Sequence, residues 1–121
     1  MSPALPWQRV LVHGPSMVPT LRHADVLLVR YGARVRPGDV VLARFHDLPD
    51  RYVVKRAVRP EAGGWWLASD NAAAGGDSRV HGVADVVARV VLYWPRSARG
   101  VRAFLPRRIG SAVTGATPPG S

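Results

Sequence analysis

The sequence predicts an all-β protein with a small, mainly antiparallel β-barrel or folded sheet. Short apolar runs rich in Val and Leu are separated by Gly, Pro and Asp about every ten residues, which is typical of all-β domains. No segment shows the apolar spacing of a helix of ordinary length. The 121 residues, 47% of them hydrophobic, suffice for one domain with a buried core.

The first three expected strands coincide with runs of Val and Leu. Residues 9–13 (RVLVH) form a short strand that leads into a loop rich in Gly and Pro. Residues 25–31 (DVLLVRY) form the second strand. Residues 36–45 (RPGDVVLARF) open with a Pro-Gly-Asp turn, which places the third strand after that turn.

The fourth expected strand, residues 51–59 (RYVVKRAVR), alternates clearly enough to assign its two faces. Successive side chains of a strand point to opposite faces, so Lys55 shares its face with Val53 and Ala57. The strand therefore gives Lys55 an apolar setting.

The remaining elements complete one domain and a tail. Residues 63–69 (GGWWLAS) are expected to form a hairpin with the preceding strand through the PEAGG turn. Residues 70–82 (DNAAAGGDSRVHG) form a long loop, in which DNAAA allows one helical turn, and residues 85–94 (DVVARVVLYW) form the last strand. We assign residues 1–95 to the domain and residues 96–121 to a basic tail, rich in Gly, Pro and Ser, that is mostly disordered.

The composition is strongly basic and lacks cysteine. The net charge is +9, and all but one of the 17 lysines and arginines are arginine. This charge fits either a bias in composition or a functional surface for nucleic acid, anionic lipid or an acidic partner. The absence of cysteine excludes disulfides and thiolate zinc sites, and the four histidines lack metal-ligand spacing, so we expect no metal or cofactor.

Ser16 lies in the segment GPSMVPTL, where Gly and Pro predict a shaped loop. A serine hydroxyl becomes a nucleophile when a base takes its proton. The histidines leave a Ser-His-Asp triad open, although none lies in a triad motif. Lys55, the single lysine, is the other candidate, because burial can lower a lysine pKa from about 10.4 toward neutrality. A Ser-Lys dyad is a known variant of serine catalysis.

Residues 10–94 resemble the type I signal peptidase family of Ser-Lys proteases. The resemblance rests on four segments that occur in the same order as in the family: PSMVPTL, RPGDVV, YVVKRA and SDNAAAGGDSRVHG. The resemblance implies a β-fold with Ser16 as the nucleophile and Lys55 as the general base. It implies an oxyanion hole that includes the Ser16 backbone N–H. Further residues would shape the serine loop or support the site: Met17 and Pro19 in the loop, and Asp70, Asn71, Asp77 and Arg79 in the later segment.

Two of these assignments have simpler alternatives. Asp70 and Asn71 are expected to form an Asx-type turn that ends the preceding strand. Asp77 and Arg79 form either a surface ion pair of little energetic value or a structural pair beneath the active site, and we favour the second interpretation.

The sequence departs from the family at three positions. Gly14 stands where many members have a serine that helps to hold the oxyanion, so backbone donors or another group must replace it. Gly75 stands where relatives have a serine that orients the lysine, so Lys55 must be oriented in another way. Ser69 replaces the usual glycine before Asp-Asn.

The sequence shows no N-terminal membrane anchor and contains the segment GGWW. In both features it resembles the unanchored family members that mature nickel superoxide dismutase. The resemblance implies a cytoplasmic endopeptidase whose partner is a protein precursor, that of nickel superoxide dismutase. Processing of exported proteins at a membrane, through peripheral contact, is one alternative. A self-cleaving repressor domain is another, for which the residues before Ser16 leave no room for a DNA-binding domain. A non-catalytic basic β-barrel that binds nucleic acid is the third. Only 7% of the residues are aromatic, so the chain offers few side chains on which nucleic-acid bases could stack.

Overall fold

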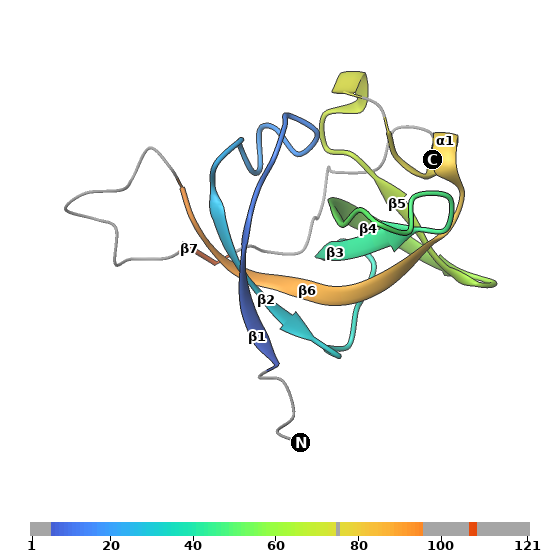
Figure 1. Cartoon of the computed structure of the whole chain (residues 1–121), viewed down its shortest axis with the longest axis horizontal. Helices are drawn as coiled ribbons and strands as arrows, with labels where there is room; N and C mark the ends of the chain where they lie inside the picture. The colour runs from blue at the N-terminus through green and yellow to red at the C-terminus, as the bar shows by residue number, and fades with distance from the viewer. Residues whose placement is uncertain (1–5, 75, 96–106, 109–121) are drawn as a thin grey trace.

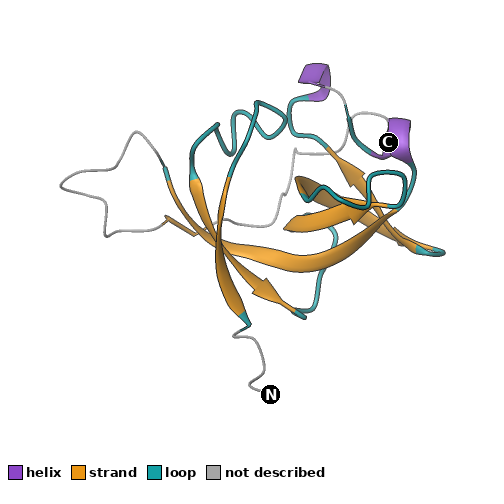
Figure 2. Ribbon diagram, in the orientation of Figure 1, coloured by secondary structure: helices purple, strands orange, loops and turns teal. Residues whose placement is uncertain are grey.

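The computed structural model describes residues 6–74, 76–95 and 107–108, which form one strongly coiled antiparallel sheet (Figure 1). The order of strands in the sheet is β1-β2-β6-β3-β4-β5, with β7 beside β6. The elements are β1 (Trp7–Leu11), β2 (Val26–Tyr31), β3 (Val40–Phe45), β4 (Val53–Glu61), β5 (Gly64–Ala68), the 3-10 turn η1 (Ala72–Ala74), α1 (Ser78–His81), β6 (Ala84–Trp94) and β7 (Arg107–Arg108). Figure 2 shows that strands make up most of the regular secondary structure in the described chain, and the all-β prediction is confirmed.

Strand β6 organises the sheet because it pairs with four other strands. Its first half, residues 84–89, pairs with β3, and its second half, residues 88–94, pairs with β2. A further pairing between β5 and β6, at Trp65 and Ala84, joins β6, β3, β4 and β5 into a closed ring. The β1–β2 ribbon extends from the other half of β6, where it carries the loop that contains Ser16.

Apolar side chains fill both faces of the sheet and form two cores. The first core lies between the β1–β2 ribbon and β6 and consists of Val12, Met17, Leu21, Leu27, Val29, Val40, Leu42, Ala88 and Val90. The second core lies inside the ring of four strands and consists of Val41, Ala43, Phe45, Ala57, Leu67 and Ala84. Successive side chains of β3 point alternately into the first and the second core, so this one strand connects both cores.

The expected strands occur at shifted boundaries. The third begins at Val40, directly after the predicted Pro-Gly-Asp turn, in which the Asp39 carboxylate accepts a hydrogen bond from Arg36 N at 2.9 Å. The predicted hairpin of β4 and β5 is confirmed. The long loop contains η1 and also α1, which was not predicted because four residues are too few to show helical periodicity.

The predicted tail lies largely outside the described residues. Of that tail the structure describes Arg107–Arg108, which form β7 opposite Tyr93 and Leu92, and the expectation of a mostly disordered tail stays a prediction. Within the described ranges, no helix is long and apolar enough to cross a membrane.

Gly64 permits the contact that closes the ring. Its φ is 150°, and a Cβ added at this position would lie 2.2 Å from the carbonyl oxygen of Ala84. That distance is far below van der Waals contact with rigid backbone, so any side chain would push β5 away from β6. Gly63, its neighbour in the turn, has a φ of 89° but no atom near the position of a Cβ.

We expect Gly64→Ala to lower the free energy of unfolding by about 2 to 3 kcal/mol, because the methyl group overpacks against the Ala84 backbone. Gly63→Ala is the matched control, since it adds only the cost of a left-handed backbone, about 1 kcal/mol. Urea unfolding of both variants measures the difference. Equal losses would show that the closure does not depend on close approach at Gly64.

Candidate active site

Ser16 lies on a closed loop between β1 and β2. The base of this loop is tied by two backbone hydrogen bonds, from Val12 N to Asp25 O at 2.9 Å and from Ala24 N to Val12 O at 2.8 Å. The Ser16 side chain is half-buried, so it is neither sealed in the core nor fully solvated. The loop therefore presents a serine from a fixed base, as the Gly and Pro pattern predicted.

The residues after Ser16 anchor the loop in the first core. Met17 and Leu21 are buried there, and Leu21 N donates to Met17 O at 2.8 Å. Pro19 is exposed and follows a cis peptide bond with Val18. Met17 thus fixes the position of the adjacent Ser16 by packing, which agrees with the loop-shaping role implied by the resemblance.

Lys55 is buried in the middle of β4. Its exposed fraction is 5%, and Ala57 on the same face is completely buried, so the predicted apolar setting is correct. Burial lowers the pKa of Lys55 below its usual value, because the ammonium loses hydration, and the negative charge of Asp77 offsets part of this shift. Lys55 therefore releases its proton more readily than an exposed lysine.

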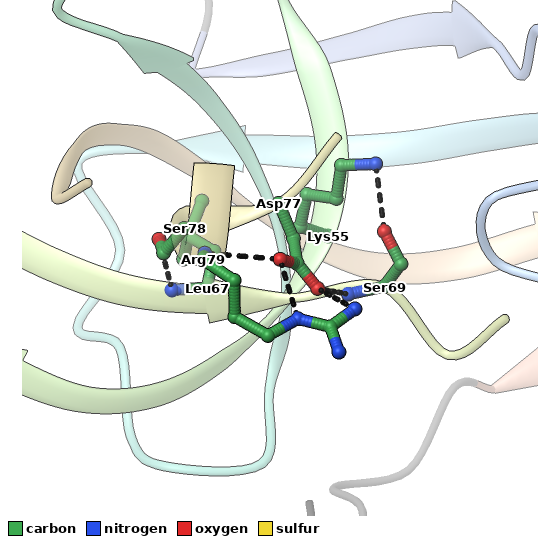
Figure 3. Close-up of polar contacts among 6 residues, drawn as sticks. All are labelled: Lys55, Leu67, Ser69, Asp77, Ser78 and Arg79. Carbon is green, nitrogen blue, oxygen red and sulfur yellow. Dashed lines mark hydrogen bonds and ion pairs between the residues drawn. The ribbon is translucent and has the colours of Figure 1, made fainter. Parts of the chain in front are cut away.

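Ser69 contacts the lysine amine directly. Lys55 Nζ donates a hydrogen bond to Ser69 Oγ at 3.0 Å, and both side chains are buried (Figure 3). Ser69 N in turn donates to Asp77 Oδ2 at 3.2 Å. In the sequence Ser69 stood out only as a departure from the family, and its contact with Lys55 was not predicted. The available signal was the loss of a serine at Gly75, which lies outside the described residues, together with the gain of one at position 69.

Asp77 is a buried structural carboxylate and not part of a simple surface pair. It caps the N-terminus of α1 by accepting from Arg79 N at 3.0 Å, and it also accepts from the Arg79 guanidinium at 3.0 and 3.2 Å. Burial pushes the pKa of Asp77 up, but these hydrogen bonds, the bond from Ser69 N and the charge of Arg79 outweigh burial and lower it. Asp77 is therefore ionised at neutral pH. Ser78 Oγ accepts from Leu67 N at 2.8 Å, which fastens α1 to β5.

Asp70 connects the serine loop to β4. Its carboxylate accepts from Arg56 Nε at 3.1 Å and Arg56 Nη2 at 2.6 Å, and from the Thr20 hydroxyl. Arg56 Nη1 also donates to Gly38 O at 2.9 Å. The prediction of a local Asx turn is wrong for Asp70, because an ion pair with a partly buried guanidinium binds the carboxylate more strongly than a nearby backbone N–H does.

Asn71 holds the serine loop from the other side. Its backbone N donates to Ser16 O at 2.8 Å, and its Nδ2 donates to Pro15 O at 3.2 Å. The Asx turn predicted for Asn71 is therefore replaced by contacts to the loop that carries Ser16. Asp70 and Asn71 together fix that loop relative to β4 and β5.

Ser16 and Lys55 line one cleft with a cavity volume of about 600 Å³. Its walls are residues 10–13, 16–17, 42 and 51–55, so β1 and β4 both contribute to the lining. Most of these side chains are apolar. The arrangement brings a loop serine and a lysine of lowered pKa to the lining of one accessible space.

One histidine, His13, lines the cleft with Ser16, and the other three do not. His23 Nδ1 accepts from Gly14 N at 3.0 Å. His46 and His81 pair with Asp85 at 3.1 Å and Asp47 at 2.8 Å, also away from that lining. Among the described residues, no group of three or more His, Cys, Asp or Glu side chains is arranged to hold a metal ion.

Comparison with known proteins identifies the family. The model of the family described as peptidase S24-like matches residues 8–91. The chain belongs to the peptidase S24-like family. A relative of this S24-like protein, mitochondrial inner membrane protease subunit 1 of Xenopus tropicalis, is 30% identical over 119 residues, covering 75% of this chain and 71% of the relative.

Membership in this family makes the S24-like protein a serine peptidase and favours an enzyme over a nucleic-acid-binding barrel. The matched range includes every residue that the sequence singled out, from Ser16 to Arg79. Its relative is a subunit of a membrane protease by name, whereas the described part of this chain contains no membrane-spanning helix.

Replacing Lys55 by Met tests the cost of burying the amine. Because the pKa of Lys55 is lowered in the folded state, the unfolded chain binds this proton more tightly, and the stability of the native protein rises with pH toward the unfolded pKa of about 10.4. We expect Lys55→Met to be the more stable form at pH 7, and its advantage to shrink as the pH approaches 10. Urea unfolding across this range, compared between the two proteins, measures the effect. A pH-independent difference would contradict a lowered pKa.

Proposed function

We propose that this S24-like protein is an endopeptidase in which Ser16 is the nucleophile and Lys55 the general base. The observation that carries the proposal is the shared cleft: a half-buried loop serine and a buried lysine of lowered pKa line the same space. A lysine that is neutral near pH 7 can accept a proton, whereas an arginine cannot.

The catalytic cycle follows from these two groups. Neutral Lys55 Nζ takes the Ser16 hydroxyl proton as Oγ attacks the scissile carbonyl carbon. The Ser16 backbone N–H donates to the oxyanion that forms. The Lys55 ammonium then gives its proton to the leaving amine, which departs and leaves an ester on Ser16. Lys55 next takes a proton from water, the hydroxide attacks the ester, and the proton returns to Ser16 as the acid product leaves.

Ser69 serves as a positioning residue in this mechanism. A neutral amine has two N–H bonds and one lone pair, and donation to Ser69 Oγ restricts the rotation of Nζ. The lone pair is then held in a limited set of directions. Ser69 is itself held by its N–H bond to Asp77, so the orientation of the amine depends on β5 and α1 and not on a flexible side chain.

Arg79 limits the influence of Asp77 on the base. An ionised carboxylate near Lys55 favours the ammonium and opposes its action as a base. The guanidinium of Arg79 occupies both carboxylate oxygens, which lowers the effective negative charge that the lysine experiences. The pair thereby gives structural support without cancelling the effect of burial.

The substrate in this proposal is a protein precursor, that of nickel superoxide dismutase, from which the enzyme removes the N-terminal leader in the cytoplasm. Support comes from the resemblance of the serine loop and the GGWW segment to the unanchored proteases that mature this dismutase. The exposed N-terminal histidine of the product would then help to bind nickel. The name of the mitochondrial relative, an inner membrane protease subunit, supports proteolysis as the class of reaction.

Cleavage of the nickel superoxide dismutase precursor tests the proposed function. We expect the purified protein to release a product that begins with histidine, identified by mass spectrometry. Lys55→Arg retains the charge but cannot act as a base, and we expect it to lower the rate by about a thousandfold or more, as Ser16→Ala does. Circular dichroism checks that both variants fold. Normal cleavage by Lys55→Arg would disprove the mechanism, and an intact precursor would redirect the substrate assignment to exported proteins.

Ser69→Ala tests the positioning role. Loss of the hydroxyl leaves the fold intact and frees the amine, so we expect kcat/KM to fall by about 10- to 100-fold. The hydrogen bond also stabilises the ammonium, so its loss should move the acidic limb of the pH profile of kcat/KM to lower pH. Ser69→Thr keeps a hydroxyl and should retain most activity. An unchanged rate and pH profile in Ser69→Ala would restrict Ser69 to a structural role.

A further inference from the structure

The cleft that contains Ser16 and Lys55 is lined by basic side chains and by no acidic side chain of the described residues. Its ionisable lining residues are His13, Arg51 and Lys55, together with the phenol of Tyr52, and among the described residues no aspartate or glutamate lines the cleft. Of the cationic groups, Lys55 is buried and assigned to catalysis. Arg51 is exposed and always charged, and the proposed mechanism does not use it.

The backbone fixes Arg51 at the rim of the cleft. It follows two successive turns, in which Leu48 N donates to Phe45 O at 3.0 Å and Arg51 N donates to Leu48 O at 3.2 Å. The residue lies two positions before β4, the strand that carries Lys55. Arg51 therefore has a defined position relative to the base although its side chain reaches solvent.

The aromatic neighbour of Arg51 contacts a second cation. Tyr52 also lines the cleft and is 55% exposed, and Arg44 Cζ lies 5.7 Å from the centre of its ring. A second guanidinium thus lies beside a side chain of the cleft lining, although Arg44 itself is not part of that lining. A polypeptide bound there enters a positive field that water screens less once the cleft is filled.

The acidic residues near the turns that precede Arg51 do not line the cleft. Asp47 pairs with His81 at 2.8 Å, and Asp85 pairs with His46 at 3.1 Å, both outside the cleft lining. Asp50 precedes Arg51 in the chain but does not line the cleft. The cleft therefore supplies no carboxylate of its own to balance Arg51.

We propose that Arg51 is a specificity-determining residue that recognises an aspartate or glutamate of the substrate, on one side of the scissile bond. This inference rests on the proposed peptidase function and names a chemical feature of its substrate. Arg51 precedes Lys55 by four residues, and four residues of extended chain span about 13 Å. The carboxylate recognised by Arg51 accordingly lies within about four residues of the bond that Ser16 attacks.

The binding chemistry favours a carboxylate over other partners. A guanidinium presents planar, paired donors that match the two oxygens of a carboxylate, and such charge-assisted pairs are stronger than neutral hydrogen bonds. A basic substrate residue at the same position would meet the Arg51 guanidinium and is disfavoured. The cleft thus selects for an acidic residue and against a basic one.

Profiling with a peptide library tests this inference. The full chain and its Ser16→Ala variant are incubated with a random peptide library, and mass spectrometry identifies the cleaved bonds. We expect cleavage that depends on Ser16, with aspartate or glutamate enriched at one position within four residues on one side. A matched peptide pair, with Glu or Gln at that position, should differ at least fivefold in kcat/KM.

Variants assign the preference to Arg51. Arg51→Gln should remove the difference between the Glu and Gln peptides, Arg51→Lys should retain part of it, and Arg51→Glu should favour a peptide with lysine at that position. Arg36→Gln is the matched control, because Arg36 is an exposed arginine outside the cleft lining whose replacement changes the net charge equally.

The outcomes separate this inference from the proposed function. Cleavage that depends on Ser16 but shows no acidic preference overturns the role of Arg51 and leaves the peptidase intact. An acidic preference that persists unchanged in Arg51→Gln also overturns it. If neither the library nor the dismutase precursor is cleaved, the proposed function and the inference both fail.

Discussion

The exclusion of one lysine amine from water is the constraint on which the rest of the site depends. An ammonium in a buried position must either lose its proton or find a counter-charge. In this protein the atom hydrogen-bonded to Lys55 Nζ is the neutral hydroxyl oxygen of Ser69 and not a carboxylate. The carboxylate of Asp77 is already bound by Arg79. The surroundings therefore orient the amine while they leave burial as the dominant influence on its proton affinity.

The fold meets this constraint by joining segments that are far apart in the sequence. Closure of the ring of β3, β4, β5 and β6 buries the middle of β4, and the absence of a side chain at Gly64 makes that closure possible. Packing of Met17 in the first core fixes the serine loop, while Asn71 binds the same loop to the end of β5. The proposed nucleophile and base are thus held by the core and by backbone hydrogen bonds, which are rigid supports for a site.

Local patterns in the sequence predicted the strands, the hairpin of β4 and β5, and the buried face of Lys55. These features depend on alternation along one strand and on turn residues, so a single segment contains the information. The partners of Ser69 and Asp70 were not predictable in this way. Asp70 binds Arg56 and Thr20, which are 14 and 50 residues away, and that proximity arises only when the sheet closes. The four-residue helix that Asp77 caps is likewise too short for periodicity to reveal it.

The chain offers a direct measurement of the central claim because Lys55 is its only lysine. Labelling with lysine enriched in ¹³C at the ε carbon gives one lysine signal, and its chemical shift against pH reports the ionisation of this amine in the folded protein. The account predicts a midpoint well below the ordinary lysine pKa of about 10.4, shifted back to the ordinary range when the protein is unfolded in urea. An ordinary midpoint in the folded protein would contradict the assignment of Lys55 as the general base.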